Sequence, residues 1–237
     1  MKAVIVAGGI GERLRPTTNN IPKPMVDVRG KPILLHIINL FKKYGITDFI
    51  IALCFLPDVI TDFFGDGTKF GVKIRYTYEN PKRPLGTAGA ISLSQKFINN
   101  TFIVTYADIL RELDIKKMID FHKKSKTFAT LNVYKRDSKD AKSIVIMDKR
   151  KKIVQFIERP NHSDLSKKYI WVNGSFYILE PEIFEWIPRD KKSDFGSDIF
   201  PKLLAFKKSL YAYPTTGYFV DIGDLKKLGL ARETFKP

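Results

Sequence analysis

Lys2-Ala-Val-Ile-Val-Ala-Gly-Gly-Ile-Gly-Glu-Arg-Leu-Arg-Pro16 decides the fold, because a short apolar strand runs directly into a glycine-rich turn. The continuous apolar run Ala3–Val6 is typical of a strand buried on both faces of a parallel sheet. The turn contains three glycines, Gly8, Gly9 and Gly11. Glycine lets the backbone approach a ligand with its N–H groups pointing inward. With Arg13 and Lys23 adding positive charge, the sequence predicts a polyphosphate site at the end of this strand.

The glycine-rich turn alone does not identify a ligand, because ordinary strand-to-helix turns also use glycine. It is not a Walker P-loop, since no Gly-Lys-Ser or Gly-Lys-Thr follows. Leu14 stands where a dinucleotide fingerprint needs its third glycine. Two ordered elements behind the turn, Arg13-Leu14-Arg15-Pro16 and Pro22-Lys23-Pro24-Met25, favour the phosphate interpretation.

Together these elements follow the signature of a known family. The chain resembles the sugar-phosphate nucleotidyltransferases, also called nucleotide-sugar pyrophosphorylases, whose N-terminal signature is close to G-G-x-G-S/T-R-L-x-P-x-T-x-x-x-P-K-P-M/L. Five more segments resemble the family in the family's order: Leu85–Ala90, Ala107–Leu110, Glu158–Pro160, Val172–Gly174 and Gly217–Gly223. The resemblance therefore extends over nearly the whole chain.

Strand-like apolar runs alternate with helical patterns in the first half of the chain, which predicts an α/β fold with a parallel sheet between helices. The expected strands are Ala3–Val6, Phe49–Leu53, Val72–Tyr78, Phe102–Tyr106 and Thr130–Tyr134. The expected helices are Lys31–Lys43, Pro57–Phe63, Ala88–Gln95 and Ile115–Lys124.

Beyond about residue 135, shorter strands separated by turns favour antiparallel pairing. The strands expected there are Ile144–Met147, Ile153–Glu158, Ser175–Leu179, Leu210–Tyr213 and Tyr218–Asp221. The helices expected there are Pro181–Trp186, Asp198–Lys207 and Asp224–Arg232.

The resemblance implies a Rossmann-like, doubly wound, mostly parallel mixed sheet of the GT-A-like kind, as in nucleotide-diphospho-sugar transferases. One domain, residues 1–237, would contain a nucleotide-binding half at 1–134 and a mixed α/β sugar-phosphate-binding half at 135–237. No C-terminal β-helix domain is expected, because no hexapeptide-repeat tail precedes Pro237.

The composition of the 237-residue chain fits one large folded domain, with 44% hydrophobic residues and no repeat or low-complexity stretch. Cys54 is the single cysteine, so disulfides and cysteine-metal clusters within the chain are excluded, and we interpret it as a small buried residue. The histidines His36, His122 and His162 are isolated from one another, which predicts structural or surface roles rather than a zinc site.

The formal net charge of +16 suggests nucleic-acid binding as an alternative function. However, the lysines come in scattered pairs without an arginine-rich arm, so we expect solvated faces that attract anionic substrates and no specific nucleic acid. Met1 leads directly into a strand, and no apolar run approaches the roughly 18 residues of a membrane span. A cytoplasmic protein without membrane insertion is expected, and a homodimer is left open.

Two aspartates follow predicted strands and are candidate Mg²⁺ ligands. Asp108 follows the strand Phe102–Tyr106, and Asp221 ends the strand before Gly223. By position alone, either residue could instead be a turn residue or a helix cap. The resemblance implies that Asp108 binds magnesium, and two carboxylates with phosphate oxygens suit Mg²⁺.

The resemblance also implies a division of roles among the other motif residues. The residues expected to bind the nucleotide are Ala7, Gly8, Gly9, Gly11, Glu12, Arg13, Lys23, Gly86 and Thr87. The residues expected to bind the sugar phosphate are Glu158, Arg159, Asn173 and Gly174. Arg13, Lys23 and Asp108 would be the catalytic residues. Without the resemblance, Thr87 could be a simple helix N-cap.

Three positions depart from the family pattern. Glu12 replaces the usual Thr or Ser, which puts the affinity for a triphosphate in doubt. Arg159 replaces the Lys of the common Glu-Lys-Pro motif, and Arg is not equivalent to Lys at a phosphate. Ala107 replaces the Gly that usually precedes the metal Asp.

The resemblance implies a sugar-1-phosphate nucleotidyltransferase, closest to the mannose-1-phosphate and heptose-1-phosphate guanylyltransferases. Glucose-1-phosphate thymidylyl-, uridylyl- and cytidylyltransferases share most of these residues and remain alternatives. So do a cytidylyltransferase for a non-sugar phosphate such as phosphocholine and a non-catalytic regulatory homologue, for which Glu12 is the one hint. A glycosyltransferase is disfavoured, because Asp108-Ile109-Leu110 lacks an Asp-x-Asp metal motif.

Overall fold

The computed structural model describes residues 1–161 and 168–237, which divide into two compact units. The first unit contains Met1–Pro84, Thr105–Ile115 and Gly217–Pro237. The second unit contains Leu85–Val104 and Lys116–Thr216. Each unit therefore combines segments that are far apart in the sequence.

The first unit contains most of the parallel strands. Its strands are β1 (Lys2–Ala7), β2 (Asp27–Val28), β3 (Lys31–Pro32), β4 (Asp48–Leu53), β5 (Lys73–Tyr78), β7 (Ile109–Arg111) and β13 (Phe219–Asp221). Its helices and short 3-10 turns are η1 (Glu12–Leu14), η2 (Lys23–Met25), α1 (Ile33–Lys42), α2 (Pro57–Phe64), η3 (Thr68–Phe70) and α6 (Leu225–Thr234).

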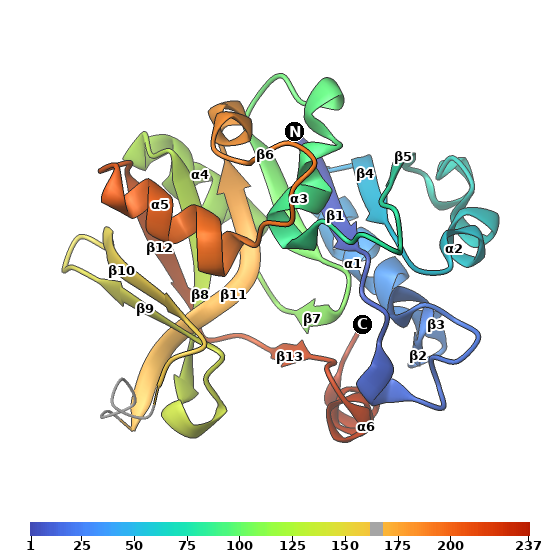
Figure 1. Ribbon diagram of the computed structural model, residues 1–237. Helices are drawn as coiled ribbons and strands as arrows, with labels where there is room; N and C mark the ends of the chain where they lie inside the picture. The colour runs from blue at the N-terminus through green and yellow to red at the C-terminus, as the bar shows by residue number, and fades with distance from the viewer. Residues whose placement is uncertain (162–167) are drawn as a thin grey trace. The chain divides into compact units, whose positions relative to one another are not determined.

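In the first unit, β1 pairs in parallel with β4, and β4 pairs in parallel with β5. Ala3, Val4 and Ile5 of β1 are fully buried, as expected for a strand covered on both faces. The carboxyl ends of these strands lie at one edge of the sheet, where ligands bind in open α/β folds. A separate antiparallel pair, β7 with β13, joins the C-terminal segment to this unit (Figure 1).

The second unit contains a mixed sheet and a hairpin. Its strands are β8 (Ala129–Asp137), β9 (Ser143–Met147), β10 (Ile153–Glu158), β11 (Tyr169–Leu179) and β12 (Leu210–Thr215). Its helical elements are α3 (Gly86–Ser92), η4 (Gln95–Phe97), α4 (Ile115–Ser125), η5 (Ser138–Asp140), η7 (Pro181–Glu185), η8 (Phe195–Ile199) and α5 (Phe200–Ala205). β6 (Phe102–Tyr106) contributes residues to both units.

β8 lies between β11, its antiparallel partner, and β12, its parallel partner. β9 and β10 form an antiparallel hairpin, drawn in yellow in Figure 1. α5 packs on β10 and η8, and an aromatic cluster of Tyr177, Phe195 and Phe200 has ring centroids 5.0 to 5.3 Å apart. The predicted α/β class, with a mostly parallel mixed sheet, is confirmed.

Several predicted elements differ from the observed ones. The helix predicted to begin at Lys31 begins at Ile33, because Lys31–Pro32 pairs with Asp27–Val28 in a short antiparallel pair. The strand predicted to begin at Ser175 begins at Tyr169, since pairing with β8 continues across an irregularity near Asn173.

The predictions for the later helices and for β12 also differ from the observed structure. Pro181–Glu185 is a 3-10 turn rather than an α-helix. The predicted helix Asp198–Lys207 is a π-helical turn, Phe195–Ile199, followed by α5. β12 pairs in parallel with β8 although antiparallel pairing was expected, because β11 ends and β12 begins at the same end of the sheet, both beside Ala129 of β8.

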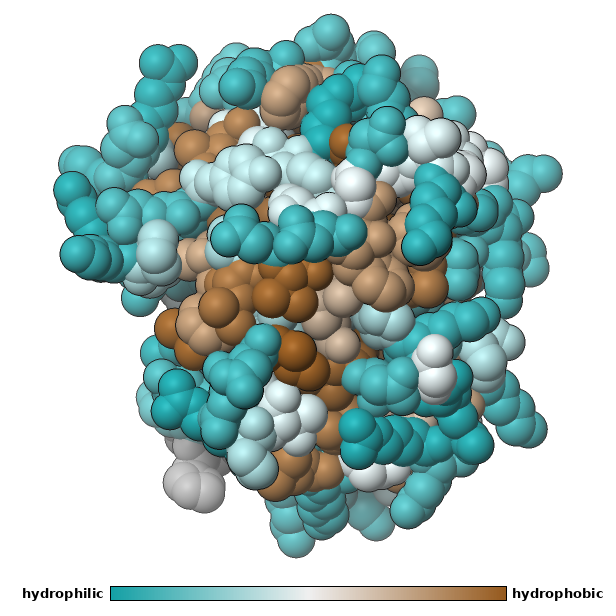
Figure 2. All heavy atoms as spheres, turned by 90° about the vertical axis from the view of Figure 1, so that its right-hand side faces the viewer, coloured by the Kyte–Doolittle hydropathy of each residue, from teal (hydrophilic) through white to brown (hydrophobic). Residues whose placement is uncertain are grey.

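The exposure of the paired lysines agrees with the prediction that they lie on solvated faces. The lysines of the pairs in the described residues are exposed or half-exposed. Figure 2 shows hydrophilic residues covering most of one face, around a central group of apolar residues. Among the residues that the structure describes, we find no helix with the length and apolar character needed to cross a membrane.

Candidate functional site

A closed glycine turn follows β1 in the first unit. Ala7 is buried at the end of the strand, and Gly11 has a φ of 73°, a left-handed conformation that favours glycine. Thr18 Oγ1 donates a hydrogen bond to the Gly11 carbonyl over 2.7 Å. A β-carbon on Gly11 would lie 3.3 Å from the Lys23 β-carbon. The turn therefore folds back on itself, with Lys23 beside it.

The other predicted residues of this turn differ in exposure. Gly8 is half-buried, whereas Gly9, Glu12 and Arg13 are exposed. Glu12 is the first residue of η1 and is exposed. Its carboxylate, in place of the Thr or Ser hydroxyl of the family signature, therefore lies on the surface of this short helical turn.

An ion pair joins two of the predicted catalytic residues. Lys23, between two prolines in the short turn η2, is 8% exposed, and its Nζ lies 2.5 Å from Oδ2 of Asp108. Asp108 follows the end of β6 after one residue, Ala107. Its other oxygen, Oδ1, is buried and has no hydrogen-bond partner within the described residues. A buried carboxylate oxygen without a partner is costly, so it is poised to accept an added ligand.

Asp221 belongs to the same part of the first unit. It ends β13 and pairs with Ile109 at the start of β7, while Ile222 N donates to the Asp108 carbonyl over 2.9 Å. Both aspartates therefore lie at the same end of the β7–β13 pair. The helix N-cap considered for Asp221 is instead Asp224, whose carboxylate accepts a hydrogen bond from a backbone N–H of α6.

Arg13 lies close to Asp221. A β-carbon placed on Gly223 would be 3.4 Å from Arg13 Nη2 and 3.5 Å from Asp221 Oδ1. Within the first unit, the guanidinium and this carboxylate thus converge on Gly223. A glycine at this position leaves space between the two charged groups.

The two aspartates fit Mg²⁺ as ligands. They supply hard carboxylate oxygens, and Oδ1 of Asp108 has no protein partner in the described part of the chain. Mg²⁺ commonly uses one or two protein carboxylates together with substrate phosphates. Within residues 1–161 and 168–237 there is no group of three or more His, Cys, Asp or Glu side chains suited to a metal. This donor set therefore fits a metal shared with substrate better than an all-protein metal cage.

Glu79 is a site candidate that sequence reasoning missed. It follows β5 directly and is 8% exposed. A β-carbon on Gly8 would lie 3.0 Å from Glu79 Oε1 and 3.1 Å from the Cys54 β-carbon. Burial, and secondly the Glu79 charge, raise the pKa of the Cys54 thiol, which agrees with a structural cysteine. The sequence offered one signal for Glu79, because it is an acidic residue that directly follows a predicted parallel strand.

In the second unit, the segment that contains Gly86 packs against Ser193. Gly86 has a φ of 75°, and a β-carbon there would lie 2.6 Å from the Ser193 carbonyl oxygen. That oxygen accepts hydrogen bonds from Ala88 N and Gly89 N over 2.9 and 3.1 Å. Ser193 N in turn donates to the Leu85 carbonyl over 2.8 Å. Both the close approach and the backbone conformation require glycine at position 86.

Thr87 is bound to Asp194, a second residue that the sequence reasoning missed. Thr87 N and Oγ1 both donate to Asp194 Oδ1, over 2.8 and 3.0 Å. Thr87 Oγ1 also accepts a hydrogen bond from Phe195 N over 3.0 Å. Thr87 is therefore not a simple N-cap, because its hydroxyl joins two segments that are far apart in the sequence.

Glu158 ends β10 and is half-buried. Burial raises its pKa, and Asp194 adds to this effect, while Arg159 and Lys142 oppose it. A β-carbon on Gly196 would collide with Glu158 Oε2, so glycine at this position leaves room for the carboxylate in its observed conformation. Arg159 is exposed, has a φ of 52°, and donates its N–H to the Lys142 carbonyl over 2.9 Å.

Asn173 and Gly174 lie at the irregularity in β11. Asn173 Nδ2 donates to the Tyr177 hydroxyl over 2.8 Å, and Asn173 Oδ1 accepts from Ser175 N over 3.0 Å. A β-carbon on Gly174 would lie 2.7 Å from Asn132 Oδ1. The Asn173 amide is thus fixed in orientation by its own strand.

Two of the three histidines have structural partners. His36 is buried, with Nε2 2.7 Å from the Val28 carbonyl, and burial lowers its pKa. His122 is also buried, and its ring contacts Thr130 Oγ1 and Glu180 Oε1, each at 2.8 Å. His162 lies outside the described residues.

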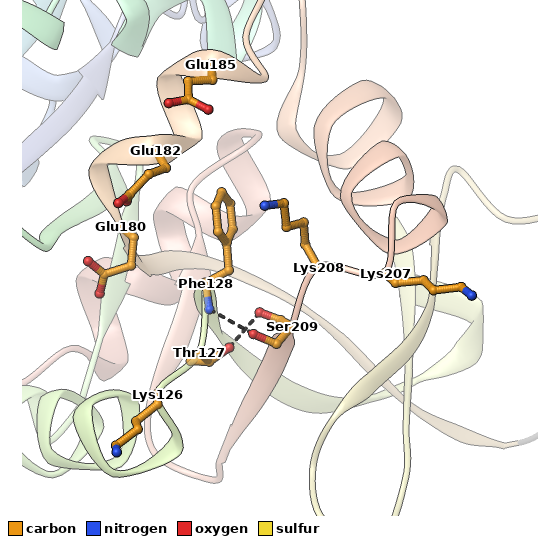
Figure 3. Close-up of a pocket in the computed structure, with 9 residues that line it drawn as sticks. All are labelled: Lys126, Thr127, Phe128, Glu180, Glu182, Glu185, Lys207, Lys208 and Ser209. Atoms are coloured by element: carbon orange, nitrogen blue, oxygen red, sulfur yellow. Dashed lines mark hydrogen bonds between the residues drawn. The ribbon is translucent and has the colours of Figure 1, made fainter.

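A separate pocket in the second unit contains none of the predicted site residues (Figure 3). Its volume is about 510 Å³, and its lining includes Glu180, Lys208 and Ser209. Thr127 Oγ1 donates to the Ser209 carbonyl, and Phe128 N donates to Ser209 Oγ, as the dashed lines show. These bonds hold the β8 and β12 ends together, so we assign the pocket wall a structural role.

Comparison with known proteins finds similar chains and a matching family. The family model described as "Nucleotidyl transferase" matches residues 2–235. A UTP–glucose-1-phosphate uridylyltransferase of Synechocystis sp. is 32% identical over 235 residues, covering 94% of this chain and 60% of the relative. A probable mannose-1-phosphate guanylyltransferase 1 of Oryza sativa subsp. japonica is 34% identical over 229 residues, covering 94% and 61%. This chain thus spans about 60% of the length of these curated relatives.

A solved structure is similar over its full length. It is the crystal structure of HddC from Yersinia pseudotuberculosis complexed with GMP-PN, with 32% sequence identity, a TM-score of 0.82 and 99% coverage of both chains. The chain belongs to the nucleotidyl transferase family.

Proposed function

We propose that this chain is a sugar-1-phosphate nucleotidyltransferase that uses GTP and mannose or heptose 1-phosphate. The observation that carries the proposal is the Lys23–Asp108 ion pair beside the closed glycine turn, with Asp108 Oδ1 buried and without a protein partner in the described residues. The family match supports the reaction class. The name of the rice relative supports GTP with mannose 1-phosphate, and the guanine nucleotide of the Yersinia complex supports GTP.

In the proposed reaction, a phosphate oxygen of the sugar 1-phosphate attacks the α-phosphorus of the triphosphate. A new P–O bond forms, the bond to the β-phosphate bridging oxygen breaks, and pyrophosphate leaves with that electron pair. The phosphate monoester is itself an adequate nucleophile, so no covalent enzyme intermediate is needed. Catalysis consists of aligning two polyanions and stabilising charge on the leaving group.

Residues of the first unit would carry most of this work. Backbone N–H groups of the glycine turn and the Arg13 guanidinium would bind the β- and γ-phosphates. Lys23 would face the transferring phosphate, held in place by Asp108. Asp108 and Asp221 would hold Mg²⁺, which when bound supplies positive charge to the phosphate oxygens.

Glu79 supports guanine over uracil and thymine. A carboxylate only accepts hydrogen bonds, and guanine presents two neighbouring donors, N1–H and N2–H₂, on one edge. Uracil and thymine present a single N3–H between two carbonyl oxygens, which a carboxylate repels. Glu79 is buried beside Gly8 at the end of β5, at the carboxyl edge of the parallel strands.

In the second unit, Glu158 would accept hydrogen bonds from sugar hydroxyls. Asn173 would accept hydrogen bonds from these hydroxyls or donate to them. Arg159 would pair with the sugar phosphate, which its planar guanidinium suits. The Arg159 backbone has a left-handed conformation, and its N–H donates a hydrogen bond to the Lys142 carbonyl. Both features fix the position of the α-carbon from which the side chain extends. Gly174, which packs closely on Asn132, would contribute through its backbone groups.

A second candidate pair of substrates is UTP with glucose 1-phosphate. The Synechocystis relative, a uridylyltransferase for glucose 1-phosphate, supports it at an identity similar to that of the guanylyltransferases. The two candidates differ at the base, so a nucleotide screen separates them.

The test is pyrophosphate release with Mg²⁺ from GTP, CTP, UTP, dTTP and ATP, each with mannose, glucose or heptose 1-phosphate. Asp108→Ala serves as the inactive control and the exposed Asp58→Ala as its matched control in the same unit. We expect release from GTP with one of the mannose or heptose substrates, lost in Asp108→Ala alone. Release from no pair by a folded, nucleotide-binding protein would overturn the proposal.

A further inference from the structure

We propose that Asp194 is a positioning residue of the second unit: it fixes the Thr87 segment and acts by its charge on Glu158. The inference rests on the proposed function, in which Thr87 belongs to the nucleotide-binding segment and Glu158 to the sugar-binding residues. Asp194 itself is assigned no contact with substrate. It would fix the geometry of one predicted binding segment and contribute to the ionisation of Glu158 in the other.

The hydrogen bonds of Asp194 support the positioning role. A single carboxylate oxygen accepts both Thr87 N and Thr87 Oγ1, and Phe195 N donates back to that hydroxyl. Hydrogen bonds to a charged acceptor are stronger than those between neutral groups. The Thr87 backbone and side chain are therefore both fixed by the residue pair Asp194 and Phe195.

The backbone of Asp194 is held firmly. Its N–H donates to Asp198 Oδ2 over 2.7 Å, within the same turn of chain. The next residue, Phe195, is fully buried and packs on Tyr177 and Phe200, with ring centroids 5.1 and 5.3 Å away. Such packing keeps the carboxylate in one place, as a positioning residue requires.

The same segment contacts Glu158. Gly196, two residues after Asp194, allows Glu158 Oε2 to occupy the space that a β-carbon would take. The groups that act on Glu158 are its own burial, which raises its pKa most, then Arg159, Asp194 and Lys142. Arg159 and Lys142 favour the carboxylate, whereas Asp194 disfavours it by like-charge repulsion.

These charges determine the direction in which the KM for sugar 1-phosphate should change with pH. If ionised Glu158 accepts hydrogen bonds from the sugar, the KM for sugar 1-phosphate rises as pH falls through the Glu158 pKa. Removing the Asp194 charge lowers that pKa, so the rise in KM moves to lower pH. Titration of the substrate phosphate is the same for all variants and cancels in the comparison.

Two substitutions separate position from charge. Thr87→Val removes the hydroxyl and keeps the Asp194 charge, whereas Asp194→Asn removes the charge and keeps an acceptor oxygen. We expect Thr87→Val to raise the nucleotide KM about tenfold, the effect of leaving polar partners unpaired, without moving the sugar-phosphate pH profile. We expect Asp194→Asn to move that profile to lower pH, with a smaller effect on nucleotide KM.

The controls are Thr87→Ser, which keeps the hydroxyl, and Glu185→Gln, which removes an exposed negative charge of the same unit. Glu185→Gln should match the unsubstituted chain in both readouts, and Thr87→Ser should raise the nucleotide KM less than Thr87→Val does. The proposal is overturned if Asp194→Asn leaves the pH profile in place, or if Thr87→Val leaves nucleotide KM unchanged. Failure of the unsubstituted chain to turn over any substrate pair would instead refute the proposed function.

Discussion

Lys23 Nζ lies 2.5 Å from Oδ2 of Asp108, and the other oxygen of that carboxylate is buried without a partner in the described residues. The Lys23 side chain is 11% exposed and that of Asp108 is 29% exposed, so water screens the pair only in part. Under the proposed function, a cation held this way would be preorganised for a phosphate, while Asp108 would keep one oxygen for another ligand.

Lys23→Ala should therefore lower kcat/KM for pyrophosphate release by about 100-fold or more, the usual effect of removing one preorganised charge from a transition state. Steady-state kinetics with the productive substrate pair measures this change. Lys31→Ala, at an exposed lysine of the same unit, should stay within about threefold of the unsubstituted chain. Equal effects in the two variants would count against a catalytic Lys23.

Glu79→Gln tests the choice of base. The glutamine amide has one NH₂ donor group and one carbonyl acceptor, so it can pair with N3–H and a carbonyl oxygen of uracil but cannot offer two acceptor oxygens to N1–H and N2–H₂ of guanine. We expect kcat/KM with GTP to fall about 100-fold while that with UTP rises, because a buried polar group is mismatched with guanine. The measurement is the GTP/UTP ratio of kcat/KM. A parallel fall with both nucleotides would show that Glu79 supports the fold rather than the base.

Gly86→Ala should destabilise the protein. The substitution places a β-carbon 2.6 Å from the Ser193 carbonyl oxygen and forces a non-glycine residue to a φ of 75°. The expected cost is about 3 kcal/mol of unfolding free energy, from left-handed backbone strain and overpacking. Thermal unfolding would show it as a fall in Tm of roughly 6–12 °C.

Gly9→Ala is the matched control for that substitution. A β-carbon on Gly9 would meet no atom within 4 Å, and the residue has no positive φ. The Tm of this variant should stay close to that of the unsubstituted chain. A Tm for Gly86→Ala within about 1 °C of Gly9→Ala would contradict the close packing of this segment on Ser193.

His122 should make folding stability depend on pH. Burial lowers its pKa below the ordinary 6.5, although Glu180 partly opposes the shift. The unfolded chain then binds more protons than the native one between that lowered pKa and 6.5, so stability falls as pH drops through this window. Urea unfolding at about pH 7.5 and about pH 5 measures the change.

His122→Asn isolates the contribution of this histidine. His36, whose pKa burial also lowers, remains in both proteins and cancels in the difference. The stability difference between the two proteins should favour the unsubstituted chain more at the higher pH than at the lower one. A difference that is independent of pH would mean that His122 keeps its ordinary pKa in the native state.

The sequence predicted the elements whose patterns are local. The apolar run of β1, the amphipathic α1 and the strand β6 appear within a few residues of their predicted bounds. The sequence predicted the length and direction of a strand less accurately where these depend on the strand with which it pairs. β11 is longer than predicted and β12 is parallel, because both depend on hydrogen bonds to β8.

The sequence by itself determined the motif residues: the glycine turn, Lys23, Asp108 and the family to which the chain belongs. Only the tertiary structure decided the neighbours of these residues. Glu79 beside Gly8 and Asp194 bound to Thr87 come from segments up to 107 residues apart, which no local pattern can pair. The physical reason is that residue type and periodicity reflect local conformation and burial, whereas contacts between distant segments are fixed by the packing of the folded chain.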